Sequence, residues 1–132
     1  MDFDVKSPIP GFENVKFVTL TSRDDFFMKL DAKEDKNLSF TLVNPFLLRN
    51  YDFEISDFYK DLLDLENSKN IAVFNIMMIK RPLEESMINF SAPLIFNMDN
   101  KTMSQVLLDD TKYPEYGLLE PISNYLEKPK KE

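Results

Sequence analysis

Hydrophobic and polar residues alternate along Met87–Asn97, and the chain's other predicted elements are arranged around this stretch. An apolar residue at every second position predicts a β-strand with one face against a core. Pro93 has no backbone N–H to donate to a sheet, so we expect the strand to be bent, bulged or at an edge there. Ile71–Ile79 and Met103–Leu108, on either side, are also typical of strands. Short links join the three, which predicts an antiparallel meander.

The first half of the chain shows shorter apolar stretches separated by polar turns. They recur roughly every ten residues, a spacing typical of a β-sandwich or a β-barrel. Two prolines and Gly11 interrupt the pattern early and predict a turn. Tyr51–Ile55 also alternates, but it is short. The predicted strands of this half are Met1–Lys6, Val15–Leu20, Phe26–Leu30 and Leu38–Val43.

Two segments are predicted to be helical. Ser56–Leu65 begins with a residue that can cap a helix, and its apolar residues recur at a spacing of three to four. A second short helix is predicted over residues 121–126, with Pro121 at its first position. Residues 127–132 form a basic tail that we expect to be disordered. The chain of 132 residues therefore predicts one mainly β domain over residues 1–126.

The amino-acid composition argues against an enzyme. The chain has no Cys, no His and two Gly, so it lacks thiolate nucleophiles, imidazole bases and Gly-rich phosphate loops. An enzyme would have to work with Asp, Glu, Lys, Tyr or Ser alone. The first residues do not follow a signal-peptide layout, and no apolar run approaches the roughly 18 residues of a membrane span. We therefore expect a cytoplasmic protein without a cofactor or a membrane partner.

The net charge is −7 and the pI is about 4.7. An acidic surface repels phosphates, so direct binding of nucleic acid is disfavoured, whereas basic proteins are attracted. The alternative is that the charge only keeps the protein soluble. Acidic pairs occur at Asp24–Asp25, Glu84–Glu85 and Asp109–Asp110, and their spacing fits solvated turns better than a metal site.

A proline corner after the strand Leu38–Val43 is a candidate contact surface. Phe46, Leu47 and Leu48 follow Pro45 where the strand ends, so at least one of them is expected to be exposed. An exposed apolar patch there would indicate partner binding. The competing interpretation is that these side chains only pack in the core.

Four motifs, in order and spacing, carry a family resemblance over roughly Phe3 to Tyr116. They are Pro10–Glu13, then Phe40–Phe46 followed by Tyr51–Ile55, then Asn89–Asn97, and last Gln105–Leu108 with Asp109 and Tyr113. Together they resemble FliW, the bacterial flagellar assembly factor.

The resemblance implies a small barrel-like antiparallel β domain with one or two short helices, at about residues 56–65 and 121–126. It also implies a cytoplasmic, non-enzymatic and monomeric protein. Proteins of this family bind flagellin and the basic RNA-binding protein CsrA, which represses flagellin translation. Flagellin that accumulates would occupy the protein and release CsrA. The alternatives are an export chaperone that ignores CsrA and a carboxylate-dependent enzyme in a small β-barrel.

Two sets of residues follow as site candidates. Motif residues expected to contact a partner are Phe12, Glu13, Asn44, Pro45, Phe46, Tyr51, Asn89, Pro93 and Asn97. Acidic residues expected to oppose RNA on a bound CsrA are Asp24, Asp25, Glu84 and Glu85. An apolar groove near Phe46, or a strand edge at Pro93, would hold a flagellin segment.

Overall fold

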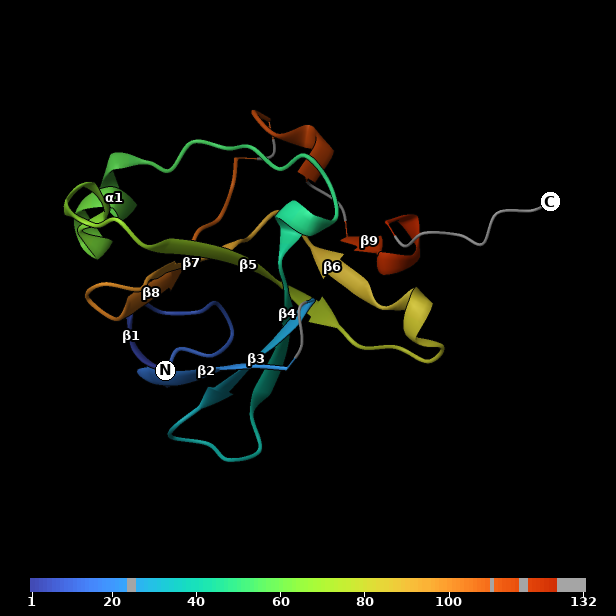
Figure 1. Ribbon diagram of the computed structural model, residues 1–132, viewed down its shortest axis with the longest axis horizontal. Coiled ribbons are helices and arrows are strands. Elements are labelled where there is room, and N and C mark those ends of the chain that lie inside the picture. The colour runs from blue at the N-terminus through green and yellow to red at the C-terminus, as the bar shows by residue number, and fades with distance from the viewer. Residues whose placement is uncertain (24–25, 110, 117–118, 126–132) are drawn as a thin grey trace.

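Nine short strands form one sheet in the computed structural model, which describes residues 1–23, 26–109, 111–116 and 119–125 (Figure 1). The alternation of apolar residues places most of the strands where the sequence predicts them. They are β1 Asp2–Ser7, β2 Phe17–Ser22, β3 Phe27–Ala32, β4 Ser39–Val43, β5 Ile71–Met78, β6 Met87–Asn89, β7 Leu94–Asn97, β8 Thr102–Gln105 and β9 Leu119–Pro121.

Seven of these strands close into a barrel in the order β4-β3-β2-β1-β8-β7-β5, because β4 also pairs with β5. Six of the pairings are antiparallel, but β1 and β8 run parallel. The expected barrel-like antiparallel domain is therefore confirmed, with one parallel pair. A closed ring with an odd number of strands cannot alternate direction all the way round, so at least one pair must be parallel.

The stretch Met87–Asn97 is two strands rather than one. β6 and β7 both run antiparallel to β5, and the residues from Phe90 to Pro93 form a turn between them. The predicted break at Pro93 is thus confirmed, since a proline cannot continue the ladder. The predicted edge is wrong, because β7 pairs with β5 on one side and β8 on the other.

Two apolar cores lie on opposite sides of β5 and β7. The first fills the barrel lumen with residues that alternate along its strands, among them Phe3, Val18, Leu20, Leu30, Leu42, Leu94, Phe96 and Met103. The second lies on the outer face, where the segments after β4 and after β8 cover the sheet. Its buried members include Val43, Tyr51, Leu63, Met77, Phe90, Ile95, Tyr116 and Ile122.

One α-helix, α1 (Asp57–Leu63), is present in the described residues and confirms the predicted helix over 56–65. Asp64 ends it in a left-handed conformation (φ 53°), and a 3₁₀ turn, η2 (Leu65–Asn67), follows. The other 3₁₀ turns are η1 Pro45–Leu47, η3 Leu83–Glu85, η4 Pro114–Tyr116 and η5 Ile122–Asn124.

The predicted helix over 121–126 does not form in its described part. Pro121 ends β9, which pairs with β6, and only the 3₁₀ turn η5 follows. The Ile122 N–H donates to the Ser86 carbonyl (2.8 Å), so the chain is held against the segment before β6 where the helix was expected to begin. Leu126 and the predicted tail, residues 127–132, lie outside the described residues. Tyr51–Ile55 is irregular and not a strand.

Candidate partner-binding surface

A groove opens at one end of the barrel, where five separate stretches of the chain meet. We call it the mouth groove, and its volume is about 600 Å³. It is lined by Ile9, Pro10, Phe12, Ser39, Phe40, Thr41, Ile76, Met77, Met78, Ile79, Asn89, Ala92, Gln105 and Leu107. None of these residues is charged, although the chain carries a net charge of −7.

The turn predicted at Pro8–Gly11 forms the first wall of the mouth groove. Gly11 has a φ of 86°, a conformation that other residues rarely adopt. The turn lets the Phe12 N–H donate to the Ile9 carbonyl (2.8 Å). The Phe12 ring then lies edge-to-face against Phe40, with the centroids 5.1 Å apart. The turn thus holds a partly exposed aromatic ring over the open end of the barrel.

The second wall forms because β4 and β5 separate. Their pairing ends at Thr41 and Met77, and the chain after Met77 continues beyond it. The Met78 and Ile79 side chains are exposed there, and the Leu107 side chain across the groove is 62% exposed. Apolar side chains that remain in water around one hollow are the usual mark of a protein-binding surface.

Two amides shape the inner part of the groove. Gln105 is buried and donates from Nε2 to the Ala92 carbonyl (3.1 Å). The Asn89 Oδ1 accepts from the Ser91 hydroxyl (2.7 Å) and the Ser91 N–H (3.1 Å). These bonds fix the turn between β6 and β7, so the groove is formed before any partner binds.

An acidic hollow adjoins the mouth groove, and Phe12 lines both. The hollow is lined by Gly11, Phe12, Glu13, Asn14, Val15, Glu34, Asp35 and Leu38. Glu34 accepts hydrogen bonds from the backbone N–H groups of Lys16 and Phe17. The bond from Lys16 is the main reason that the pKa of Glu34 lies below its usual value. The Glu34 carboxylate is therefore ionised at neutral pH.

A second groove, which we call the side groove, lies between the start of α1 and the segment after β8. Its lining residues are Phe53, Glu54, Ile55, Ser56, Asp57, Tyr59, Lys60, Val106, Leu107, Leu108, Asp109, Lys112 and Tyr113. An ion pair between Glu54 and Lys112 (2.9 Å) spans it, and both side chains are largely exposed. Leu107 is the ridge between the two grooves, since it lines both. The side groove thus mixes both signs of charge with apolar surface.

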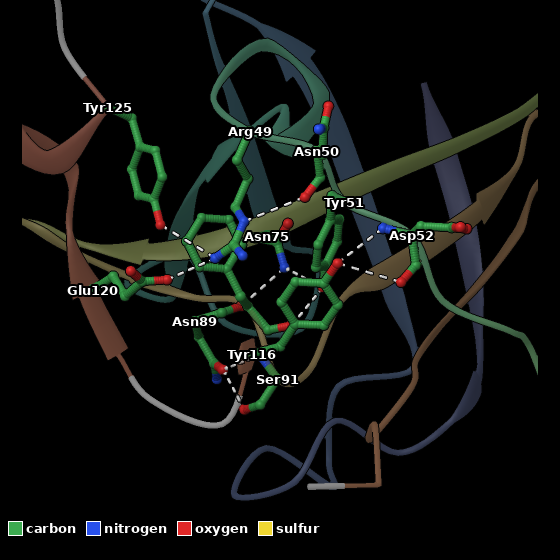
Figure 2. A network of polar contacts seen from close by, with 11 residues as sticks. Arg49, Asn50, Tyr51, Asp52, Asn75, Asn89, Ser91, Tyr116, Glu120 and Tyr125 are labelled. Atoms are coloured by element: carbon green, nitrogen blue, oxygen red, sulfur yellow. Dashed lines mark hydrogen bonds and ion pairs between the residues drawn. The ribbon is translucent and has the colours of Figure 1, made fainter. Parts of the chain in front are cut away.

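A buried polar network supports the corner after β4 (Figure 2). The Tyr51 hydroxyl donates to the Phe90 carbonyl and accepts from the Asn75 Nδ2 (3.2 Å). Burial raises the pKa of Tyr51 well above its usual value, so the hydroxyl keeps its proton. Asn75 also donates to the Asn89 carbonyl (2.9 Å), which links β5 to the inner part of the mouth groove.

Arg49 ties the same corner to the end of the described chain. Its guanidinium lies 4.8 Å from the Tyr116 ring centroid and 5.1 Å from that of Phe90. It also donates to the Glu120 carboxylate (2.8 Å) and the Tyr125 hydroxyl (3.2 Å), as Figure 2 shows. A partly buried arginine held by two rings and a carboxylate is a structural anchor.

The comparisons with known proteins identify the family. The model of the family described as "FliW protein" matches residues 2–117 of this chain. The chain belongs to the FliW family. "Flagellar assembly factor FliW 2" of Wolinella succinogenes is 56% identical over 125 residues, which is 95% of this chain and 92% of that protein. "Flagellar assembly factor FliW" of Sulfurimonas denitrificans is 48% identical over 128 residues, covering 97% of this chain and 100% of that protein.

The fold agrees with a solved member of the FliW family. The "Crystal structure of the flagellar assembly factor FliW" superposes with a TM-score of 0.84 at 23% identity, covering 97% of this chain and 88% of that one. The sequence resemblance to FliW and the barrel that it implies are thereby confirmed. Membership of a family of flagellar assembly factors points to a role other than catalysis and to a flagellar protein as partner.

Three of the predicted contact residues, Phe12, Glu13 and Phe46, lie on the surface. Phe12 and Glu13 line the acidic hollow, and Phe12 also lines the mouth groove. Phe46 is 54% exposed, as expected after the proline corner, and Leu47 beside it is exposed too. Asn89 is half-buried at the mouth groove. The groove does not include Phe46, so the exposed residues divide between two places.

The remaining predicted contact residues are interior or structural. Asn44 accepts from the Phe46 N–H (3.0 Å) and caps η1, whose first residue, Pro45, is buried. Tyr51 belongs to the polar network. Pro93 is buried between β6 and β7. Asn97 is fully buried and donates to the Leu63 carbonyl at the end of α1 (2.7 Å).

The predicted acidic surface is partly described. Glu84 and Glu85 are exposed in η3. Asp24 and Asp25 lie outside the described residues. Arg23 and Leu83, the neighbours of the two pairs in sequence, line a common hollow. In the described part of the chain no group of three or more metal-binding side chains gathers, and no helix there is long and apolar enough to span a bilayer.

Sequence reasoning missed the exposed apolar residues Met78, Ile79 and Leu107. Ile71–Ile79 and Met103–Leu108 are both typical of strands, and nothing in an apolar run marks the residue at which the neighbouring strand separates. A usable signal was the length of the runs. Ile79 follows the last residue of β5, and Leu107 lies two residues beyond the last residue of β8.

Proposed function

We propose that this protein binds flagellin in the cytoplasm and also binds the translational repressor CsrA, so that the level of free flagellin sets the level of free CsrA. The observation that carries the proposal is the match to the FliW family over residues 2–117, which spans every residue of the mouth groove. Flagellin would occupy the protein as it accumulates, and the CsrA thereby released would repress further translation.

The surface supports a protein-binding role. The mouth groove is uncharged, preformed and rimmed by exposed apolar side chains. A segment of a partner protein can dock in such a groove by placing its apolar side chains there. We propose that the protein is monomeric when free and contacts neither a membrane nor nucleic acid directly.

The net charge supports the action on CsrA. A protein of net charge −7 docked on a basic RNA-binding dimer places negative potential beside the RNA path, and this raises the free energy of binding phosphates. Neutralising Glu84 and Glu85 together with Asp24 and Asp25 should therefore weaken RNA displacement more than CsrA binding. Equal losses, or no change in either, would contradict this mechanism.

Isothermal titration tests the switch. The purified protein is titrated with CsrA, then with flagellin, and then with CsrA after flagellin has bound. The proposal expects heat of binding in the first two titrations and its loss in the third. Binding of flagellin but not of CsrA would indicate an export chaperone without a role in translation. Binding of neither would contradict the proposed function.

A further inference from the structure

The mouth groove and the acidic hollow form one continuous surface, because the Phe12 ring is a wall of both. On one side of the ring the lining is apolar and uncharged. On the other side three carboxylates, Glu13, Glu34 and Asp35, line the hollow with no Lys or Arg side chain among the lining residues. A segment of a few residues that crosses Phe12 would contact both parts.

The negative charge of the hollow is not neutralised by the nearest lysines. The Lys33 ammonium pairs with Asp2, and Lys33 does not line the hollow. Lys36 is exposed in the same turn, and Lys16 lowers the pKa of Glu34 through its charge, yet two lysines against three carboxylates leave an excess of negative charge. The hollow therefore attracts a cation, and the groove beside it attracts apolar side chains.

We infer that this surface docks a protein segment in which apolar side chains stand next to a lysine or arginine, so that the apolar part fills the mouth groove and the cation enters the acidic hollow. The inference rests on the proposed function, and of the two partners proposed there it selects the basic one, CsrA. Flagellin is then left to another surface.

The side groove differs in charge and supports this division. Its rim carries Lys60 and Lys112 as well as Glu54, Asp57 and Asp109, and the Glu54–Lys112 ion pair crosses it. Such a surface does not favour a partner of one sign. Leu107, shared by both grooves, makes an unsuitable test residue, because its substitution would change both surfaces.

Two matched pairs of substitutions test the inference by isothermal titration. The first pair is Glu13→Lys and Glu66→Lys, which change the net charge equally at exposed sites inside and outside the hollow. The second pair is Ile79→Ser and Ile71→Ser, which remove the same exposed side chain at opposite ends of β5. Melting curves of the four variants check that the fold persists.

Glu13→Lys and Ile79→Ser are each expected to weaken CsrA binding about tenfold, and their controls less than about twofold. Flagellin binding should stay within about twofold for Glu13→Lys. A milder variant, Glu13→Gln, should make CsrA binding less sensitive to salt, since one charge of the hollow no longer contributes.

If the wild-type protein binds CsrA and neither Glu13→Lys nor Ile79→Ser changes the affinity, the inference is overturned. The proposed function then stays intact. Loss of flagellin binding in Ile79→Ser, with CsrA binding retained, would also overturn it by assigning the groove to the other partner. Wild-type protein that binds neither partner would overturn the inference and the proposed function together.

Discussion

Tyr51 shows how a residue within a family-like motif can serve the fold. Its hydroxyl donates to the Phe90 carbonyl and accepts from Asn75, deep in the outer core. Its ring lies edge-to-face against Tyr116, with centroids 4.7 Å apart. A side chain so enclosed stabilises the corner from below, and the neighbouring Phe46 is the side chain that reaches solvent.

We predict that Tyr51→Phe lowers the free energy of unfolding by about 1–2 kcal/mol, because the Phe90 carbonyl loses its donor in a buried site. Urea denaturation measures the change. Tyr113→Phe is the matched control, since its hydroxyl accepts from the Glu54 N–H nearer the surface (2.7 Å). The control should cost about 0.5 kcal/mol. A loss no larger for Tyr51→Phe than for Tyr113→Phe would contradict the prediction.

Stability should fall in alkaline solution because of buried phenols. Burial raises the pKa of Tyr125 to about 12 and that of Tyr51 well above its usual value. An unfolded tyrosine has a pKa of about 10, so above this pH the unfolded chain releases protons that the folded chain keeps. The free energy of unfolding therefore decreases as pH rises from about 10 to about 12.

Denaturant titrations at several alkaline pH values measure this slope. Tyr125→Phe should flatten it, because the phenol that ionises only in the unfolded chain is gone. The same slope in the wild type and in Tyr125→Phe would show that other groups, such as lysines, cause the alkaline loss.

Asn97 is the second residue whose role the sequence did not reveal. Its Nδ2 donates to the Leu63 carbonyl (2.7 Å) and the Ser68 hydroxyl (2.6 Å), and its Oδ1 accepts from the Asp99 N–H (3.0 Å). We predict that Asn97→Ala lowers the free energy of unfolding by about 2–3 kcal/mol, because buried backbone groups lose their partners. Asn67→Ala, at an exposed site, should cost less than about 0.5 kcal/mol. Similar urea midpoints for the two variants would contradict the prediction.

Among the elements, those with a strong local pattern could be predicted from the sequence. Alternation located the barrel strands, and the spacing of apolar residues in Ser56–Leu65 located α1. The second helix could not be excluded, because Pro121 is as suitable at the end of a strand as at the start of a helix. What decides is the pairing of β9 with β6, which is a tertiary contact.

The turn at Pro8–Gly11 is an element on which the mouth groove depends. We predict that Gly11→Ala lowers the free energy of unfolding by about 1–2 kcal/mol, since a Cβ is disfavoured at a φ of 86°. No atom lies within 4 Å of the added Cβ, so the cost is in the backbone alone. Asn14→Ala, in the same loop, is the control for thermal melts. Equal stability of Gly11→Ala and the wild type would show that the turn accommodates the side chain.

At the scale of the whole molecule, closure of the barrel determines which residues line the mouth groove, and the sequence alone does not predict this. The mouth groove is assembled from the residues around 9–12, 39–41, 76–79, 89–92 and 105–107, which meet because β4 and β6 pair with β5 and β1 pairs with β8. The candidate site is therefore a product of topology. The motif residues placed Phe12 and Asn89 on it, but the apolar rim has no local signature.

Closure also bears on self-association. A closed barrel leaves few unpaired strand edges, and a net charge of −7 makes copies repel one another. We predict that the free protein sediments as a monomer of 15.5 kDa at low and at high salt. Sedimentation-velocity ultracentrifugation measures this. A dimer that appears when salt screens the charge would show that the exposed apolar rim can pair with itself.

The position of β5 between two cores has a consequence for exchange of backbone hydrogens with solvent. Its edges pair with β4, β6 and β7, the lumen core packs on one face, and the outer core packs on the other. Deuterium should therefore reach the amides of this strand only when the whole protein unfolds. Ile79 directly follows this most protected strand. A partner that docks there meets a surface already immobilised, and little conformational entropy is lost in forming the complex.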